Sequence, residues 1–227
     1  MRTVRLMKIG AATAMLAAST ASLATVLVVR AAGPSAKVYP PGKALPENAK
    51  IQLQAGDSVM LLNTNGARML RGPGTFSVAS SGDGLAASSG RRARFSAMRS
   101  GDVALNPSPW NLDVTQSGKL CVSNSGKLTL WRPEKDEAIQ ITIRGGGTEQ
   151  TLDWPAGKDT IQWPASLPVK SGAEYQLSQT QSGDTARVTF VTIADPPSDT
   201  VSTAQSLIAN GCMNQLDVLV DGSPQAE

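Results

Sequence analysis

The side chains that most often carry enzymatic chemistry are scarce in this sequence. Its 227 residues include no histidine and only two cysteines. Without histidine there is no Ser-His-Asp or Cys-His machinery, and no His-ligated zinc, haem or non-haem iron. Two cysteines are too few for a cysteine-rich metal site. The sequence therefore predicts no catalytic residue, no metal site and no cofactor.

A hydrolase would need paired carboxylates or a Ser-Lys pair, and neither stands out. The candidate carboxylates are Asp153, beside Trp154, and Asp136-Glu137, beside a turn. Their surroundings favour turn and edge positions over acid/base roles. Gly145-Gly146-Gly147 lacks the Lys-Ser/Thr of a phosphate loop, so a hairpin turn is favoured over nucleotide binding.

Three tryptophans, Trp131, Trp154 and Trp163, stand at the ends of candidate strands, directly before a proline or one residue before it. Large aromatic side chains in this position can close a hydrophobic core where proline ends the strand. They can also line a surface that binds a glycan, a peptide or a protein. Periodicity does not separate the two interpretations, so the three residues are a candidate binding surface.

The N-terminus has the order of a secretory signal. Basic residues in 1–8 precede an uncharged, alanine-rich stretch over Ile9–Val29. Cleavage is plausible after Ala24 or after Ala31, and an uncleaved anchor is the alternative. We expect a periplasmic or secreted protein without stable membrane insertion once the leader is cleaved.

The cysteines and the charge fit this compartment. Cys121 and Cys212 are predicted to pair in an oxidising space, with two buried free thiols as the alternative. The formal charge is +3, but four of the basic residues lie within residues 1–31. A basic cluster (Arg91, Arg92, Arg94, Arg99) is favoured as a solvated loop over an anion site. No nucleic-acid partner follows from this charge.

Short β-prone runs separated by turns fill residues 50–78, and Asn65-Gly66 is a hairpin signal. Ala55-Gly56-Asp57-Ser58-Val59, followed by Leu70-Arg71-Gly72-Pro73-Gly74-Thr75-Phe76, resembles the FecR-type domain of bacterial envelope proteins. This resemblance, over about thirty residues, implies a small β-rich periplasmic module of the kind found in sigma-factor regulators and other envelope proteins. The chain departs from the regulators because its export signal begins at Met1, where they carry a cytoplasmic domain.

Residues from Trp110 to Ile193 show the pattern of an immunoglobulin-like β-sandwich, with about eight short strands and turns at near-regular spacing. The candidate strands are Leu112–Thr115, Lys119–Ser123, Leu128–Trp131, Ala138–Arg144, Gln150–Trp154, Thr160–Trp163, Glu174–Gln179 and Ala186–Ile193. A helix follows, with Ser198 or Asp199 as N-cap and Asn210-Gly211 as its end. A second helical stretch over Cys212–Val220 completes a hairpin expected to pack on the sandwich.

The predicted organisation is mainly β, in seven parts. These are a signal peptide (1–31), a proline-rich linker (32–49), a FecR-like β module (50–80), a flexible connector (81–105), an immunoglobulin-like sandwich (106–195), a helical hairpin (196–222) and a disordered tail (223–227). We expect a non-enzymatic envelope protein that binds or assembles with another envelope protein or a cell-wall polymer. The alternatives are a signal-transduction accessory and a carboxylate-dependent cell-wall hydrolase.

Overall fold

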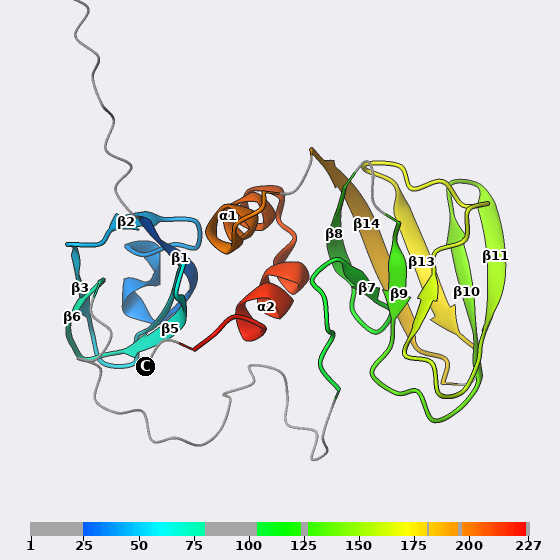
Figure 1. Ribbon diagram of the computed structural model, residues 1–227, viewed down its shortest axis with the longest axis horizontal. Helices are drawn as coiled ribbons and strands as arrows, with labels where there is room; N and C mark the ends of the chain where they lie inside the picture. Colours follow the sequence, from blue (N-terminus) through cyan, green and yellow to red (C-terminus); the bar gives the residue numbers. More distant parts are fainter. Residues whose placement is uncertain (1–24, 80–103, 124–126, 181, 195–196, 226–227) are drawn as a thin grey trace, which may run out of the picture.

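Two β bodies lie on either side of a pair of helices in the computed structural model (Figure 1), which describes residues 25–79, 104–123, 127–180, 182–194 and 197–225. The N-terminal body holds the first strands of the chain, and the other is a sandwich of two sheets. The helices are the last elements of the chain, yet they contact both bodies. The mainly β fold with a C-terminal helical hairpin is confirmed.

The N-terminal body is a four-stranded sheet, ordered β2-β1-β4-β5, packed against a two-stranded sheet of β3 and β6. One core lies between the two sheets and is built from Val26, Val28, Ile51, Val59 and Leu61, among others. The elements are β1 (Thr25–Ala32), η1 (Pro34–Lys37), β2 (Ala44–Pro46), β3 (Lys50–Leu53), β4 (Ser58–Asn63), β5 (Gly66–Arg71) and β6 (Gly74–Ser77).

Strand β1 corrects the predicted end of the leader at residue 31. Val26 and Val28 face the core between the sheets, whereas Leu27 and Val29 face the helices. All four side chains are at most 1% exposed. A strand buried on both faces is a continuous apolar run, so in sequence it merges with the apolar part of a signal peptide.

The predicted linker over 32–49 is also folded. Its proline-rich stretch forms η1 and β2, and β2 pairs with β1 in antiparallel register. Asp57 holds this stretch in place, because its carboxylate accepts the backbone N–H of Ser35 at 2.8 Å and that of Gln54 at 2.5 Å. Apolar and polar residues do not alternate in this stretch. Its structure depends on hydrogen bonds to residues further along the chain, which the sequence pattern does not reveal.

The hairpin predicted at Asn65-Gly66 exists, one residue earlier in register. Asn63 pairs with Gly66 across the β4–β5 ladder, so Thr64 and Asn65 form the turn. The Asn63 side chain accepts the backbone N–H groups of Asn65 and Gly66 at 2.8 and 3.1 Å. The asparagine before the turn therefore supplies the hydrogen bonds that hold the turn.

The two halves of the FecR-like sequence lie against each other. The backbone N–H of Gly72 donates to the carbonyl of Asp57 at 3.0 Å. A Cβ at Gly72 would collide with the carbonyl of Gln54. Turn residues far apart in the motif thus close one end of the N-terminal body.

The sandwich pairs a five-stranded sheet, ordered β11-β10-β13-β14-β8, with a three-stranded sheet, ordered β12-β9-β7. All of the candidate strands predicted in this region are present, within one to two residues at each end. They are β7 (Asn111–Asp113), β8 (Gly118–Ser123), β9 (Thr129–Trp131), β10 (Ile139–Gly145), β11 (Thr148–Trp154), β12 (Thr160–Gln162), β13 (Glu174–Gln179) and β14 (Thr185–Ile193). Most of these strands bury one face, so apolar and polar residues alternate along their sequences.

The helices are α1 (Thr200–Asn210) and α2 (Met213–Asp221). Asp199 caps α1 by accepting the backbone N–H of Ser202 at 2.8 Å, and Gly211 ends it in the left-handed conformation, as the sequence predicts. The hairpin packs on the sandwich, as predicted, and it also packs on the N-terminal body. One hydrophobic cluster joins Leu27 and Leu62 of the N-terminal body, Leu207 and Leu216 of the helices and Ile193 of β14.

The helical hairpin is attached to both bodies. On the sandwich side, Cys212 is bonded to Cys121 of β8. On the other side, Arg30 of β1 donates from Nε to Asp217 of α2 at 2.8 Å, and the Arg30 Nη1 atom lies 3.6 Å from Asp221. We refer to the pair of helices as the clasp, because it connects the first strand of the chain to the sandwich.

The predicted disordered tail is folded as far as Gln225. Ala67 of β5 donates its backbone N–H to the carbonyl of Pro224 at 2.8 Å, and Ala67 and Gln225 form a parallel bridge. Gly66 is required there, because a Cβ at that position would overlap the Pro224 carbonyl. Pro224 and Gln225 therefore cover the start of the outer edge of β5.

Candidate functional site

The three tryptophans proposed as a binding surface are buried, so that interpretation is wrong. Trp131, Trp154 and Trp163 are 3%, 0% and 9% exposed. The Trp163 ring meets Tyr175 and Phe190 edge to face, with centroids 5.4 and 5.3 Å apart, and its Nε1 donates to the Leu167 carbonyl at 2.6 Å. These residues close the sandwich core, and proline ends their strands.

Arg132, next to Trp131, is a buried cation that serves the same core. Its guanidinium lies over the Trp154 ring, 5.1 Å from the centroid. Nε donates to the Lys158 carbonyl at 3.1 Å and Nη2 to the Pro155 carbonyl at 3.0 Å. Burial lowers the pKa of Arg132. Its bonds hold a turn together, and it presents no charge to a ligand.

The predicted disulfide between Cys121 and Cys212 is confirmed. Both residues are buried, at 1% and 0% exposed. Gln215 of α2 lies beside the bond and pairs with the Cys121 backbone in both directions. It accepts from the N–H at 2.6 Å and donates to the carbonyl at 3.0 Å. The amide side chain thereby takes the place of a neighbouring strand on the open side of β8.

The candidate carboxylates do not converge. Asp153 accepts from Gln140 Nε2 at 2.8 Å on the outer face of the sheet. Asp136 and Glu137 lie exposed in the loop before β10. Within the part of the chain that the structure describes, no group of three or more His, Cys, Asp or Glu side chains could hold a metal ion.

Gly145-Gly146-Gly147 is a hairpin turn, as predicted. Gly145 pairs with Thr148 at the end of the β10–β11 ladder, and Gly146 and Gly147 have φ of 61° and 84°. These values match the tight turn that connects antiparallel strands. The two strands that it joins run to the outer edge of the sandwich.

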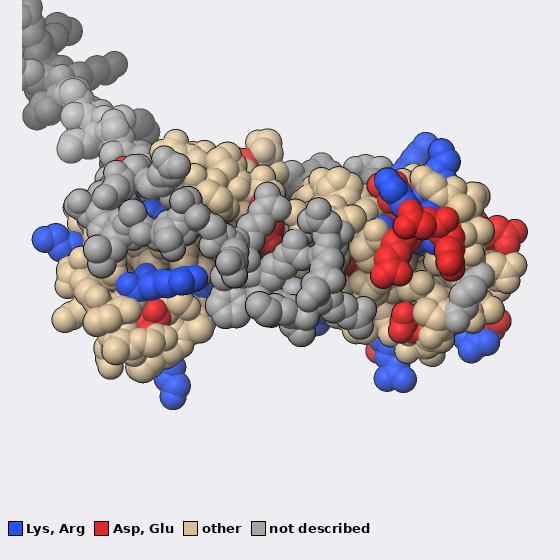
Figure 2. Space-filling view, turned by 90° about the horizontal axis from the view of Figure 1, so that it is seen from below, with Lys and Arg blue, Asp and Glu red and all other residues tan. Residues whose placement is uncertain are grey.

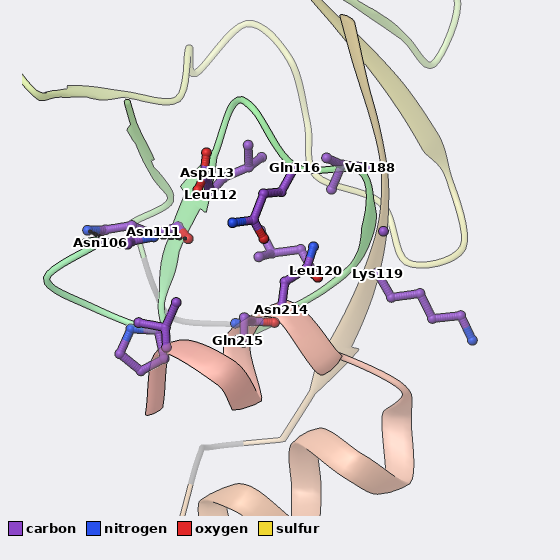
Figure 3. A pocket seen from close by; sticks show the side chains of 13 residues that line it. Asn106, Asn111, Leu112, Asp113, Gln116, Lys119, Leu120, Val188, Asn214 and Gln215 are labelled. Carbon is purple, nitrogen blue, oxygen red and sulfur yellow. Dashed lines mark hydrogen bonds between the residues drawn. The ribbon is translucent and has the colours of Figure 1, made fainter. Parts of the chain in front are cut away.

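A small hollow lies where α2 meets the start of β8 (Figure 3). Its volume is about 20 Å³, room for one water molecule. The Gln116 side chain points into it, whereas Lys119 points away. Burial raises the pKa of Asp113 at its rim, against hydrogen bonds from Thr115 that lower it. The hollow is too small for an organic ligand.

A wider groove of about 340 Å³ runs between residues 105–109 and the end of α2. Leu105 and Val218 contribute apolar surface, and Asp221 is the one ionisable side chain among its lining residues. Asp221 already faces Arg30. The groove thus lacks the convergent polar groups that orient a small ligand.

One strand differs from the others in how the free edge of its sheet is protected. Free edges attract extended chains, and proteins guard them by shortness, proline, charged side chains (lysine above all), bulges or cover. Strands β2, β7 and β12 have three residues each, and β3 and β6 have four. The β5 edge is bridged by Gln225, and Gln215 occupies the β8 edge. Gln225 bridges β5 at Ala67 alone, and among the described edge strands β11 is the longest without such cover.

Strand β11 is long, and two carboxylates are the only such protection within it. It has seven residues, TEQTLDW, without proline or lysine, and its ladder with β10 runs without a bulge. It ends the sheet order, so no strand in the described parts of the chain pairs with the backbone groups on its other side. Glu149, Thr151 and Asp153 are exposed on the outer face, and Leu152 is half-buried on the inner face. We call this feature the β11 edge.

The β11 edge is acidic. Arg144 hydrogen-bonds Glu149, with Nε and Oε2 2.6 Å apart, and this bond lowers the pKa of Glu149. The exposed loop with Glu134, Asp136 and Glu137 precedes β10 and lies near the end of β11, where Gly157 donates to the Lys135 carbonyl at 2.6 Å. In Figure 2, acidic side chains gather at the sandwich end of the molecule, with a few basic ones among them. Sequence reasoning identified β11 as a strand but had no signal for its place in the sheet.

Comparison with protein-family models and with curated proteins finds no match to this chain. The resemblance of residues 50–78 to a FecR-type domain therefore stays a prediction. None of the helices in the described parts of the chain is long and apolar enough to cross a membrane.

Proposed function

We propose that this protein is an exported, non-enzymatic envelope protein that acts as a binding or assembly module and meets its partner at the β11 edge. The observation that carries the proposal is the contrast between the two edges of one sheet. The β8 edge is occupied by Gln215 and bonded to the clasp, whereas the seven-residue β11 edge is bare. An extended segment added to such an edge gains backbone hydrogen bonds along its whole length.

Export is supported by the position of β1. Because Thr25–Val29 belong to the folded body, the apolar stretch left for a leader is Ile9–Ala24, about 16 residues, whereas a helix that spans a bilayer needs about 20. Residues 1–24 lie outside the described part. Cleavage after Ala24 would leave β1 whole, whereas cleavage after Ala31 would remove a strand from two cores. The disulfide also fits an oxidising compartment.

Two observations favour binding over catalysis. The sequence has no histidine, and the carboxylates considered below are engaged in hydrogen bonds within the fold. Asp57, Asp153 and Glu149 are each held by hydrogen bonds within the fold. The cell-wall hydrolase would require two carboxylates that face each other across a cleft, and neither hollow supplies such a pair. A signal-transduction role rests on the FecR-like resemblance alone.

The edge is tested by photo-crosslinking in cells that export the protein. A photoreactive residue replaces Thr151 on the β11 edge, and a matched control carries it at Arg187, exposed in the central strand β14. We expect one adduct of defined mass from position 151 and none from 187. Equal yields from both positions, or no adduct from 151, would contradict the proposal.

Export is tested by intact mass with and without reduction. We expect a mature chain that begins at Thr25, with no free thiol before reduction. A full-length chain with two thiols that react without reduction would overturn the export proposal.

A further inference from the structure

We infer that the occupant of the β11 edge is residues 91–99 of a second copy of this chain. This inference rests on the proposed function, because it names the partner at the same edge. Both copies would then offer an acidic edge and a basic extended segment, so the contact is heterologous and can join copies head to tail.

The sequence RRARFSAMR at 91–99 has the chemistry that the edge lacks. It carries four arginines and no acidic residue, and it contains no proline or glycine. In an extended chain, alternate side chains point to opposite faces. Arg92 and Arg94 then share one face and Phe95 takes the other. A pairing that sets the arginines beside Glu149 and Asp153 sets Phe95 on the side of half-buried Leu152.

Basic and acidic residues are also distributed unequally between the two parts of the whole chain. Residues 25–103 contain 10 basic and 4 acidic side chains, whereas residues 104–227 contain 8 basic and 14 acidic. In Figure 2 the largest group of acidic side chains lies at the sandwich end of the molecule. Complementary halves steer one copy toward the opposite end of another.

Symmetric antiparallel pairing of two β11 strands centred on Thr151 is disfavoured by the same charges. Antiparallel pairing about Thr151 would set Glu149 of one copy directly opposite Asp153 of the other, twice in one dimer. Like charges at directly opposed positions destabilise a strand pair. A basic segment removes this repulsion.

Pairing of the whole segment within one copy would stretch its connection to the limit. Leu105 and Val218 of α2 line the same groove, and α2 packs on β8. Strand β11 lies four places from β8 in the sheet, about 19 Å at the usual strand spacing. The five steps from residue 99 to residue 104 span at most about 18 Å. Arg99 would therefore reach β11 of its own copy only with this connection fully extended, which favours a second copy as the partner.

The test uses the full mature chain from Thr25 with its disulfide intact, in sedimentation velocity between about 1 and 100 µM at low salt. One variant is Arg92→Glu with Arg94→Glu, and the other is Glu149→Lys with Asp153→Lys. The matched control is Glu47→Lys with Lys50→Glu, two exposed positions on the N-terminal body. Circular dichroism verifies that each variant is folded.

The native chain and the control are expected to associate as concentration rises, and raising sodium chloride from about 50 to 500 mM should weaken the association about tenfold or more. Each charge-reversed variant alone should stay monomeric. An equimolar mixture of the two should associate, because each then offers the charge that the other requires. A native chain that is monomeric at 100 µM, or a mixture that fails to associate, would overturn the inference.

The two proposals fail differently. If the chain is monomeric in solution while Thr151 still forms a defined adduct in cells, the edge binds another protein and only the second copy is ruled out as partner. If the adduct has twice the mass of the chain and its cross-linked peptide contains residues 91–99, both proposals are supported. If position 151 forms no adduct, the edge itself is not a binding site.

Discussion

Removal of the Cys121–Cys212 disulfide should lower the free energy of unfolding, because it removes the covalent link between the clasp and the sandwich. The bond joins residues 91 positions apart, so it encloses β9 to β14 and α1. Closing a loop of this length removes about 15.6 cal/mol/K of entropy from the unfolded chain, or about 4.6 kcal/mol at 25 °C. Because single domains are stable by about 5–15 kcal/mol in total, the loss should be large.

We expect Cys121→Ala with Cys212→Ala to lower the free energy of unfolding by about 4 to 5 kcal/mol in urea titrations. Fluorescence of the buried tryptophans reports the sandwich, and circular dichroism at 222 nm reports the helices. Reduction of the native chain breaks the crosslink but keeps both sulfur atoms. Comparison with the double alanine variant therefore separates the effect of the crosslink from the effect of sulfur packing. A loss below about 1 kcal/mol in both experiments would refute the reasoning, because the loop would then be constrained without the bond.

Three further changes test other links in the fold. Gln215→Ala leaves the Cys121 backbone groups unpaired beneath α2 and should cost about 2–3 kcal/mol in urea titrations, whereas exposed Gln205→Ala should stay within about 0.5 kcal/mol. Burial acts to raise the pKa of Asp57, but hydrogen bonds from Ser35 and Gln54 outweigh it and the pKa lies below its ordinary value. The stability that this carboxylate contributes is therefore full above about pH 5 and lost as pH falls below about 4. The difference in urea midpoint between the native chain and Asp57→Asn should therefore become smaller below about pH 4. A difference that grows in acid would contradict the hydrogen-bond argument. A chain that begins at Ala32 loses four side chains buried to 1% or less, each contributing about 1.5–3 kcal/mol, and should show no cooperative unfolding; a cooperative transition would show β1 to be dispensable.

The sandwich and the helical hairpin could be predicted because their information is local. Strands such as β10 bury one face, so apolar and polar residues alternate within the strand itself. Asp199 and Gly211 mark the ends of α1 by the conformations that they adopt. The disulfide followed from two lone cysteines and a presumed oxidising compartment, and the structure brings their Cα atoms to 5.8 Å.

The predictions that were wrong concern residues whose environment is set from far away in the chain. Strand β1 lost its alternation because one face meets β3 and β6 and the other meets helices about 180 residues later. The tryptophans at strand ends had two possible directions, and only the packing of the two sheets assigned them to the core.

By itself, the sequence determined the mainly β class, the strands of the sandwich, the paired cysteines and the lack of histidine chemistry, because these depend on composition and on neighbours within a few residues. Only the tertiary structure decided that the helices join two bodies, that Gln215 occupies one sheet edge and that β11 leaves the other bare. Strand order is a property of long-range pairing, and a strand carries no local record of whether it lies at the centre or at the edge of its sheet.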